Sequence, residues 1–414
     1  MINSIELFAG CGGLLDGFEQ TGHYKMLGAV EWEKAPCINL VRRLQDKWHI
    51  KDAQKRVLRF DMQRTEELFY GWDDPEYGKS IGGLDKLVGS SNVDLVVGGP
   101  PCQAYSIAGR VRDEMGMKKD YRNYLFESYI TVVRHYMPKA FVFENVPGIL
   151  SSRPGNDNIK IIDIIRNEFE EAGYVILSPL KNAVIDMSEY GVPQNRKRII
   201  ILGLSKEIYG KDCKDLLSEF YNILLPGFKT KTKKTVRDAI GDLPKLFPLG
   251  YTQKVNGVRT AHSLPTPYVP NHIARWNNSR DIEIFRLLET DIESGKNKYA
   301  STQALKQLYT EMTGKVSNVH KYHVLKWDEP SNLIPAHLYK DGLRHIHPDS
   351  QQARSITARE AARLQTFPDD YIFYGSNTDI YKMIGNAVPP LFAKYVAEAV
   401  FNLLFRKERN VYDG

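Results

Sequence analysis

The sequence has little cysteine, with four residues in 414, and none is spaced from another as in a metal site or a disulfide framework. It has no apolar run long enough to span a membrane and no signal peptide, because Met1 to Glu6 leads directly into a strand-like segment. These absences predict a reduced, cytoplasmic protein that acts without a membrane. A large excess of one charge is also lacking: the formal net charge of +6 permits a nucleic-acid partner without requiring one.

What remains is the composition of an ordinary globular protein. Hydrophobic residues make up 42% of the chain and charged residues 26%. A chain of 414 residues is long for one core, so we expect two domains, or one large domain with a substantial insertion.

Short apolar runs alternate with helical segments in the first half of the chain. Strands are expected at 5–8, 26–30, 93–97, 140–143 and 199–202, and a further strand is expected to end at 59–61. Helices are expected to end at residue 19 and to span 124–136. This alternation predicts an α/β fold with a parallel, doubly wound sheet. It stops between 206 and 352, a polar region with one clear helix near 280–292, which we interpret as a domain inserted before the sheet is completed.

A glycine turn, Phe8-Ala9-Gly10-Cys11-Gly12-Gly13, lies between the first strand and the first helix. Such a turn lets the backbone approach a nucleotide-like ligand closely. At the end of the next strand, Glu31 can accept hydrogen bonds from ribose hydroxyls and Trp32 can stack on adenine. The alternative is a structural turn with an unrelated surface glutamate. The glycine spacing departs from the dinucleotide fingerprint, which favours a cofactor other than NAD.

The segment Val97-Gly98-Gly99-Pro100-Pro101-Cys102 places a cysteine on a rigid turn at the end of a strand. The glycines and prolines prevent the strand from continuing, and open α/β sheets bind their ligands at such ends. A thiolate must be exposed and preorganised to attack a substrate, so this position favours a nucleophile over an inert buried cysteine.

Charged residues flank two further strands. Glu144 directly follows an apolar strand, so it reaches the edge of Cys102 if the strands are parallel, either as a proton donor or as a structural carboxylate that caps backbone amides. Arg196 and Arg198 precede the apolar run 199–202 and share one face. They reach the same edge if this strand is antiparallel, where they would hold a phosphate or a base carbonyl; the alternative is simple surface charge.

In this order the segments resemble the motifs of the DNA (cytosine-5)-methyltransferases, over nearly the whole chain and most closely the bacterial or phage restriction-modification type. The resemblance rests on the strings FAGCGGL, EW at 31–32, GGPPCQAYS, ENVPG, QNRKR, RSITAREAARLQTFPDDY and IGNAVPP. It implies a Rossmann-like methyltransferase sheet in a catalytic, cofactor-binding domain, 1–205, completed by 373–414. A smaller target-recognition domain would span 206–372, organised by the motif at 354–368.

The resemblance also implies the role of each site residue. Cys102 is the nucleophile toward a flipped cytosine, Glu144 engages ring nitrogen 3, and Arg196 and Arg198 are the active-site arginines. S-adenosylmethionine, converted to S-adenosylhomocysteine, is expected to contact Phe8, Gly10, Gly12, Gly13, Glu31, Trp32, Asp61, Pro101, Leu125, Asn386 and Val388. Asp61 lies in a looser match than the others.

Basic segments are the candidates for contacts with phosphate. The loop 104–122 resembles the family's mobile catalytic loop, and it carries Arg110, Arg112, Lys118 and Lys119. The basic run 229–234 either meets the DNA backbone or is a solvated face. No metal is expected, because the histidines at 320, 323, 337, 345 and 347 are irregularly spaced and have no cysteine beside them.

The implied substrate is double-stranded DNA, and the implied enzyme is a monomer that acts separately from any cognate restriction endonuclease. One alternative is a tRNA cytosine-5 methyltransferase, although the variable region has no Cys-Phe-Thr string. A catalytically inactive DNA-binding module is another, although Cys102 and Glu144 are intact. A nicotinamide-dependent oxidoreductase would leave Cys102, Glu144 and both arginines without a purpose. The DNA sequence recognised is not readable from the chain.

Overall fold

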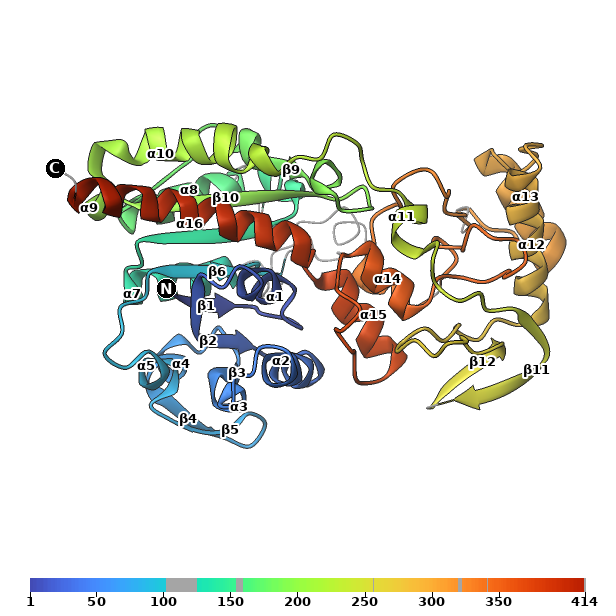
Figure 1. Cartoon of the computed structure of the whole chain (residues 1–414), viewed down its shortest axis with the longest axis horizontal. Helices are drawn as coiled ribbons and strands as arrows, with labels where there is room; N and C mark the ends of the chain where they lie inside the picture. Colours follow the sequence, from blue (N-terminus) through green and yellow to red (C-terminus); the bar gives the residue numbers. More distant parts are fainter. Residues whose placement is uncertain (102–124, 154–158, 256, 319–321, 341, 413–414) are drawn as a thin grey trace. The chain divides into compact units, whose positions relative to one another are not determined.

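The computed structural model describes residues 1–101, 125–153, 159–255, 257–318, 322–340 and 342–412. Contacts divide the chain into two compact units, each formed from separate stretches of sequence (Figure 1). The first unit comprises Met1–Tyr190, Arg196–Lys231 and Val388–Gly414, and the second comprises Gly191–Asn195 and Thr232–Ala387. None of the described helices is long and apolar enough to cross a membrane.

An eight-stranded sheet with the order β3-β2-β1-β6-β7-β10-β8 forms the centre of the first unit, with β9 also paired to β10. The strands are β1 (Ile2–Leu7), β2 (Tyr24–Glu31), β3 (Val57–Arg59), β6 (Leu95–Gly98), β7 (Ala140–Asn145), β8 (Tyr174–Ile176), β9 (Val184–Asp186) and β10 (Lys197–Ser205). β3, β2, β1, β6 and β7 are parallel, whereas β10 is antiparallel to all its neighbours. The doubly wound α/β fold expected from the alternation is confirmed, and strand order reverses between β1 and β6.

Helices of the first unit connect and cover these strands. They are α1 (Gly13–Glu19), α2 (Lys34–Asp46), α3 (Ala53–Arg56), α4 (Thr65–Tyr70), α5 (Gly83–Val88), α7 (Leu125–Tyr136), α8 (Ile161–Glu171), α9 (Lys206–Tyr209), α10 (Cys213–Glu219) and α16 (Pro390–Tyr412). The buried Tyr129 hydroxyl fixes α7 to the sheet, at 3.1 Å from the Val96 carbonyl oxygen and 2.9 Å from that of Val142. α16 lies along α1 (Figure 1), where a Cβ on Gly17 would stand 2.5 Å from that of Ala393.

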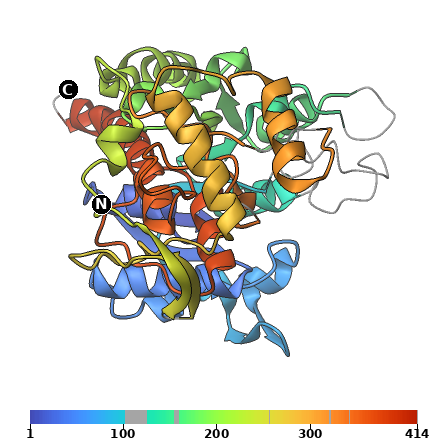
Figure 2. The same ribbon diagram turned by 90° about the vertical axis from the view of Figure 1, so that its right-hand side faces the viewer.

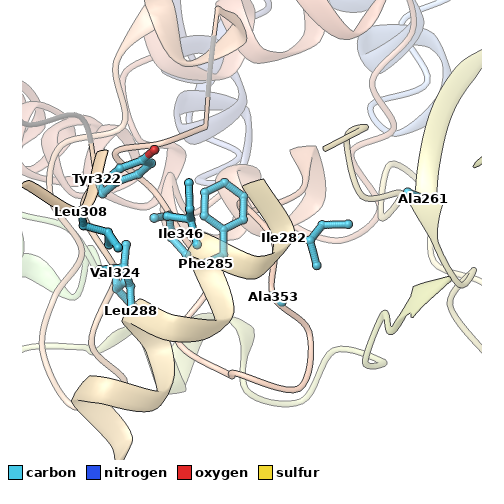
Figure 3. Packing of buried hydrophobic residues seen from close by; sticks show 10 residues of the cluster. Ala261, Ile282, Phe285, Leu288, Leu308, Tyr322, Val324, Ile346 and Ala353 are labelled. Atoms are coloured by element: carbon cyan, nitrogen blue, oxygen red, sulfur yellow. The ribbon is translucent and has the colours of Figure 1, made fainter. Parts of the chain in front are cut away.

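The second unit contains five α-helices and a β-hairpin among its described residues. They are α11 (Val236–Ile240), β11 (Pro248–Val255), β12 (Val258–His262), α12 (Ser279–Glu293), α13 (Thr302–Thr313), α14 (Ala358–Leu364) and α15 (Asn377–Asn386). α12 confirms the helix expected near 280–292 (Figures 1 and 2), and its Phe285 and Leu288 share one buried cluster with Leu308 of α13. Figure 3 shows these side chains together with Val324 and Ile346 from the segments that follow.

Buried charges of the motif that begins at Arg354 organise this unit. Arg354 donates from Nη1 and Nη2 to the two carboxylate oxygens of Glu360, each at 2.7 Å. The buried Arg359 donates to the carbonyl oxygens of Pro270, Pro368 and Tyr371 at 3.0, 3.3 and 2.8 Å. These contacts join α14 to two loops, so the motif has an architectural role here.

The boundaries of the units differ from the expected ones at 206 and 372. Residues 206–231 stay with the first unit because α10 packs on β8 and β10, and the Tyr221 hydroxyl accepts from the Leu202 amide at 2.9 Å and donates to the Ile200 carbonyl at 2.7 Å. Residues 373–387 belong to the second unit, where Gly385 of α15 lies against the Pro335 carbonyl. A loss of strand–helix alternation therefore does not mark the boundary in this chain.

Candidate active site at the carboxyl edge of the sheet

Strand register brings the predicted motifs to one edge of the first unit's sheet. The paired positions are Leu7 with Val30 and Gly98, Gly98 with Phe143, and Glu144 with Ile200. The residues that follow β1, β2, β6 and β7 therefore emerge side by side, together with the start of the antiparallel β10. Because strand order reverses between β1 and β6, this edge is where an open α/β sheet forms its ligand crevice.

An ion pair joins the ends of β7 and β10. Arg198 Nε lies 2.9 Å from Glu144 Oε1, and the two side chains are only 13% and 12% exposed. Such a charge-assisted hydrogen bond is stronger than a neutral one, so it fixes the direction of both side chains. The sequence analysis required the strand before Glu144 to be parallel to the strand before Cys102, and the strand of Arg198 to be antiparallel. The structure has both arrangements, since β7 is parallel to β6 and β10 is antiparallel to β7.

The two glycines before the prolines are required by close packing. A Cβ on Gly98 would lie 2.5 Å from the Leu7 carbonyl oxygen, and one on Gly99 would lie 2.7 Å from Glu144 Oε2. The sequence suggested only that they end the strand. In the structure they let β6 lie against β1 and let the turn lie against the Glu144 carboxylate.

Asn145 ties the proline turn to the end of β7. Its Nδ2 donates to the Pro100 carbonyl oxygen at 3.3 Å, and its Oδ1 accepts from the Val146 amide at 2.9 Å. Pro101 is half-buried and is the last described residue of this turn. Cys102 and the basic loop 104–122 lie outside the described residues.

Arg196 precedes β10 and is buried, with 2% of its surface exposed. Asn195 and Lys197 are exposed, so the residues alternate along this stretch and Arg196 shares its less exposed side with Arg198. The Arg196 carbonyl oxygen accepts from the Met187 amide at 2.9 Å, which holds the approach to the strand.

The glycine turn after β1 uses left-handed backbone at three positions, with φ values of 56° at Phe8, 57° at Gly10 and 81° at Gly12. A Cβ on Gly10 would meet nothing within 4 Å, so its backbone faces open space, whereas one on Gly12 would collide with Leu40. Gly13 begins α1. Gly10 therefore offers the accessible backbone that a closely bound ligand needs.

Glu31 is held beside this turn by backbone amides. Its Oε2 accepts from the Gly10 amide and its Oε1 from the Glu33 amide, both at 2.8 Å. Burial raises the pKa of this carboxyl to about 7, against the opposing effect of these amides. The next residue, Trp32, keeps 37% of its surface exposed. A buried acceptor and an exposed aromatic ring thus stand at adjacent positions.

The remaining expected cofactor residues lie in different places. Asp61 follows β3 and accepts from the Gln63 amide at 3.0 Å. Leu125 is buried at the start of α7, and Val388 is half-buried in the first unit. Asn386 is exposed at the end of α15, in the second unit.

Glu6 is a charged residue that the sequence analysis missed. It lies inside β1 with 3% of its surface exposed, and burial raises its pKa well above the ordinary value, against a hydrogen bond from the Leu15 backbone. Its signal in the sequence is a carboxylate between two apolar residues of a central strand.

The histidines of the second unit have structural partners. The ring Nε2 of His345 is 3.1 Å from the Leu333 carbonyl oxygen, and Nδ1 of His347 accepts from the Asp349 amide at 3.2 Å. Burial lowers the pKa of both rings to about 3. Within the described ranges no group of three His, Cys, Asp or Glu side chains could hold a metal ion, and His320 falls outside those ranges.

Comparison with solved structures shows the fold. A protein encoded within an E. coli prophage superposes with a TM-score of 0.63 at 22% identity, covering 98% of this chain and 100% of the other. The S. pombe Dnmt2 methyltransferase superposes with a TM-score of 0.55 at 16% identity, covering 98% and 99%.

Comparison of sequences shows the family. The model of the C-5 cytosine-specific DNA methylases matches residues 2–402. The Type II methyltransferase M.Bpa9945I of Bacillus paralicheniformis is 34% identical, over 97% of this chain and 98% of its own length. The Type II methyltransferase M.AgeI of Thalassovita gelatinovora is 28% identical, over 96% and 99%. The chain belongs to the C-5 cytosine-specific DNA methylase family.

Proposed function

We propose that this DNA cytosine-5 methyltransferase transfers a methyl group from S-adenosylmethionine to a flipped cytosine in a specific duplex sequence, through a covalent adduct with Cys102. The observation that carries this proposal is the Glu144–Arg198 ion pair against the turn that leads into Cys102. It supplies an acid–base group and a cation beside the expected nucleophile, on one rigid edge.

The chemistry requires these residue types because carbon 5 of cytosine is a poor nucleophile. The Cys102 thiolate adds to carbon 6, and Glu144 delivers a proton to ring nitrogen 3, so that carbon 5 gains enamine character. S-adenosylmethionine supplies an electrophilic methyl group. Carbon 5 bonds to this methyl group as the methyl–sulfur bond breaks, which leaves S-adenosylhomocysteine. Removal of the carbon-5 proton then expels the thiolate, Glu144 takes back the proton of ring nitrogen 3, and the aromatic ring is restored. The base must leave the stack to reach these groups, since none of this is possible inside a duplex.

The two carboxylate oxygens of Glu144 have different roles in this proposal. Oε1 is held by Arg198, whereas Oε2 faces the turn at Gly99. We assign Oε2 to ring nitrogen 3, and the guanidinium of Arg198 to the developing charge on the 2-keto oxygen. Arg196, buried on the same side of the strand, supports this arrangement as the second arginine of the site.

The residues at the neighbouring turn fit S-adenosylmethionine. Open space at the Gly10 backbone and the partly exposed Trp32 ring suit an adenosyl group, and the Glu31 carboxylate suits its ribose hydroxyls. Phe8, Gly12 and Gly13 shape the turn, and Asp61, Pro101, Leu125, Asn386 and Val388 are the further proposed contacts.

The relatives' names support a role in restriction-modification, where methylation protects host DNA from a separate endonuclease. We propose that the enzyme acts as a monomer and that the second unit recognises the target sequence. In the basic run 229–234, Lys229 lies 2.6 Å from the Glu189 carboxylate and Lys234 lies 3.7 Å from that of Asp238, which favours the solvated-face alternative for these two lysines.

Trapping with 5-fluorocytosine tests the mechanism. Duplex DNA containing this base should form a covalent adduct with the protein and S-adenosylmethionine, and Cys102→Ser should abolish it. No adduct on any mixed-sequence duplex would refute the mechanism. An adduct on fluorinated tRNA in place of DNA would establish the RNA alternative, and DNA binding without an adduct would establish the inactive-module alternative.

A further inference from the structure

Residues 243–280 of the second unit contain no aspartate or glutamate, but they contain five lysines and arginines. Acidic residues number 50 in the 414-residue chain, so about four or five would be expected in a stretch of this length. The same stretch exposes four large aromatic side chains: Phe247, Tyr251, Tyr268 and Trp276. A basic and aromatic surface without carboxylates is complementary to nucleic acid.

The β11–β12 hairpin lies inside this stretch and places two cations opposite each other. Lys254 pairs in register with Arg259, and both side chains are exposed. Like charges directly opposite on an antiparallel pair are destabilising. Among the residues that the structure describes, no carboxylate forms an ion pair with either side chain. The hairpin thus keeps an unfavourable pair that an anionic partner would relieve, the kind of local conflict found at functional sites.

Arg259 is oriented by an aromatic ring. Its guanidinium carbon lies 4.1 Å from the centroid of the Trp276 ring, and Trp276 Nε1 donates to Thr252 Oγ1 at 3.3 Å. Stacking uses the face of the guanidinium and leaves its in-plane N–H donors available for a planar acceptor. By contrast, Arg280 is bound to the Asp281 carboxylate at 3.1 Å, and Arg275 donates to the Leu338 carbonyl at 3.1 Å.

The base of the hairpin is anchored in the core of the second unit, which supports the paired positions Lys254 and Arg259. Ala261 packs in the core cluster with Ile282 and Phe285 (Figure 3), and the ring Nε2 of His262 is 2.9 Å from the Gln352 carbonyl oxygen. A two-stranded ribbon fits the width of the DNA major groove. A site built on such an element holds its reading group more precisely than a loop does.

We infer that the β11–β12 hairpin enters the major groove of the target and that Arg259 reads a guanine there. Its parallel N–H groups would donate to the O6 and N7 atoms of the base, whereas Lys254, a point charge on a flexible stem, contacts phosphate. This inference rests on the proposed function, because it takes duplex DNA as the substrate. It makes Arg259 the specificity-determining residue for one position of the target.

Selection of bound duplexes from a random library tests this assignment without requiring methylation. The wild-type protein should enrich a sequence containing a guanine whose replacement weakens binding. Arg259→Ala should lose about 5- to 150-fold in affinity for that site and lose preference at that single position. Arg259→Lys should not restore the preference. Lys254→Ala should weaken binding to all sequences equally and reduce the salt slope by about one.

Arg280→Ala is the matched control, since it removes an exposed cation of the same stretch that already has a carboxylate partner. It should leave the preference unchanged. Melting curves and S-adenosylhomocysteine binding identify variants that fail to fold, and for these Arg259→Gln provides the second test. An Arg259 variant that folds and keeps the full wild-type preference overturns the inference, as does one that weakens all sequences equally. Failure of the proposed function is distinguishable, because the wild-type protein would then select a sequence but methylate no cytosine in it.

Discussion

Glu31 should make cofactor affinity depend on pH in a range where most carboxyl groups do not titrate. Burial raises its pKa from 4.5 to about 7, although the amides of Gly10 and Glu33 hydrogen-bond to its oxygens. Ribose hydroxyls donate to an ionised carboxylate, and a protonated carboxyl loses part of its capacity to accept. The form of Glu31 that is proposed to bind the cofactor is therefore lost as the pH falls through 7.

The size of the effect follows from this value. With a pKa of about 7, Glu31 is roughly 90% ionised at pH 8 and roughly 10% ionised at pH 6. If only the ionised form binds well, affinity falls about tenfold between these pH values, which is about 1.4 kcal/mol. Most of the loss should occur below pH 7.

Calorimetric titration with S-adenosylhomocysteine at pH 6, 7 and 8 measures this dependence. Glu31→Gln should bind about tenfold more weakly than the wild type at pH 8 and show little change from pH 8 to pH 6. Glu19→Gln is the matched control. Burial also raises the pKa of Glu19 to about 7, but Glu19 is the last residue of α1 and is not one of the proposed cofactor contacts. This control should keep the wild-type pH dependence. Equal wild-type affinity at pH 6 and pH 8, or a pH dependence that survives in Glu31→Gln, would refute the reasoning.

Three further substitutions probe the active-site edge and the second unit. Gly99→Ala should lower kcat by about 100-fold with unchanged cofactor affinity, because the new Cβ would lie 2.7 Å from Glu144 Oε2. Single-turnover methylation measures this effect, and an unchanged rate would contradict the prediction. Arg198→Lys should lower kcat by about 100-fold by removing the 2.9 Å contact to Glu144 Oε1, and a pH–rate profile identical to the wild type would argue against this role. Burial without hydrogen-bond partners raises the pKa of Glu289 to about 9, whereas the carboxyl of the unfolded chain ionises near 4.5. Glu289→Gln should therefore stabilise the fold by about 3 kcal/mol more at pH 7.5 than at pH 5. Urea unfolding at both pH values measures this difference in stability. Glu283→Gln, at an exposed position, is the control and should show no such difference. A stabilisation by Glu289→Gln that does not grow with pH would be inconsistent with a buried neutral carboxyl.

The sheet could be predicted because its strands are nearly continuous apolar runs, which only a sheet buried on both faces needs. The same pattern identified Glu144 and Arg198, since each stands next to such a run. Their meeting depended on strand direction, which a single strand's sequence does not contain. The ion pair between them required the pairing of β7 with β10, whose paired positions Asn145 and Ile199 are 54 residues apart in the sequence. It could therefore be expected only conditionally.

The boundary of the second unit could not be predicted from the same signals. Residues 206–231 lack strand–helix alternation, yet they pack on β8 and β10, and composition does not show which core a short helix joins. Packing likewise explains Gly98 and Gly99, because their necessity comes from Leu7 and Glu144 on neighbouring strands. The ion pair of Arg354 with Glu360 was easier to anticipate as architectural, because the two residues are close in sequence at the start of one helix.

The rigidity of the active-site edge determines which partner must change shape. Gly98 lies against the Leu7 carbonyl, Gly99 lies against Glu144, and Asn145 donates to the Pro100 carbonyl, so the turn before Cys102 is closely packed against two neighbouring strands. In the proposed mechanism the cytosine moves to the site, and unstacking it costs a few kcal/mol. This cost has to be met by binding energy from DNA contacts away from the reacting base. Arg259, which stacks on Trp276 and has no carboxylate partner among the described residues, is suited to supply part of that energy only at the correct DNA sequence. Recognition of the sequence would then be coupled to base flipping.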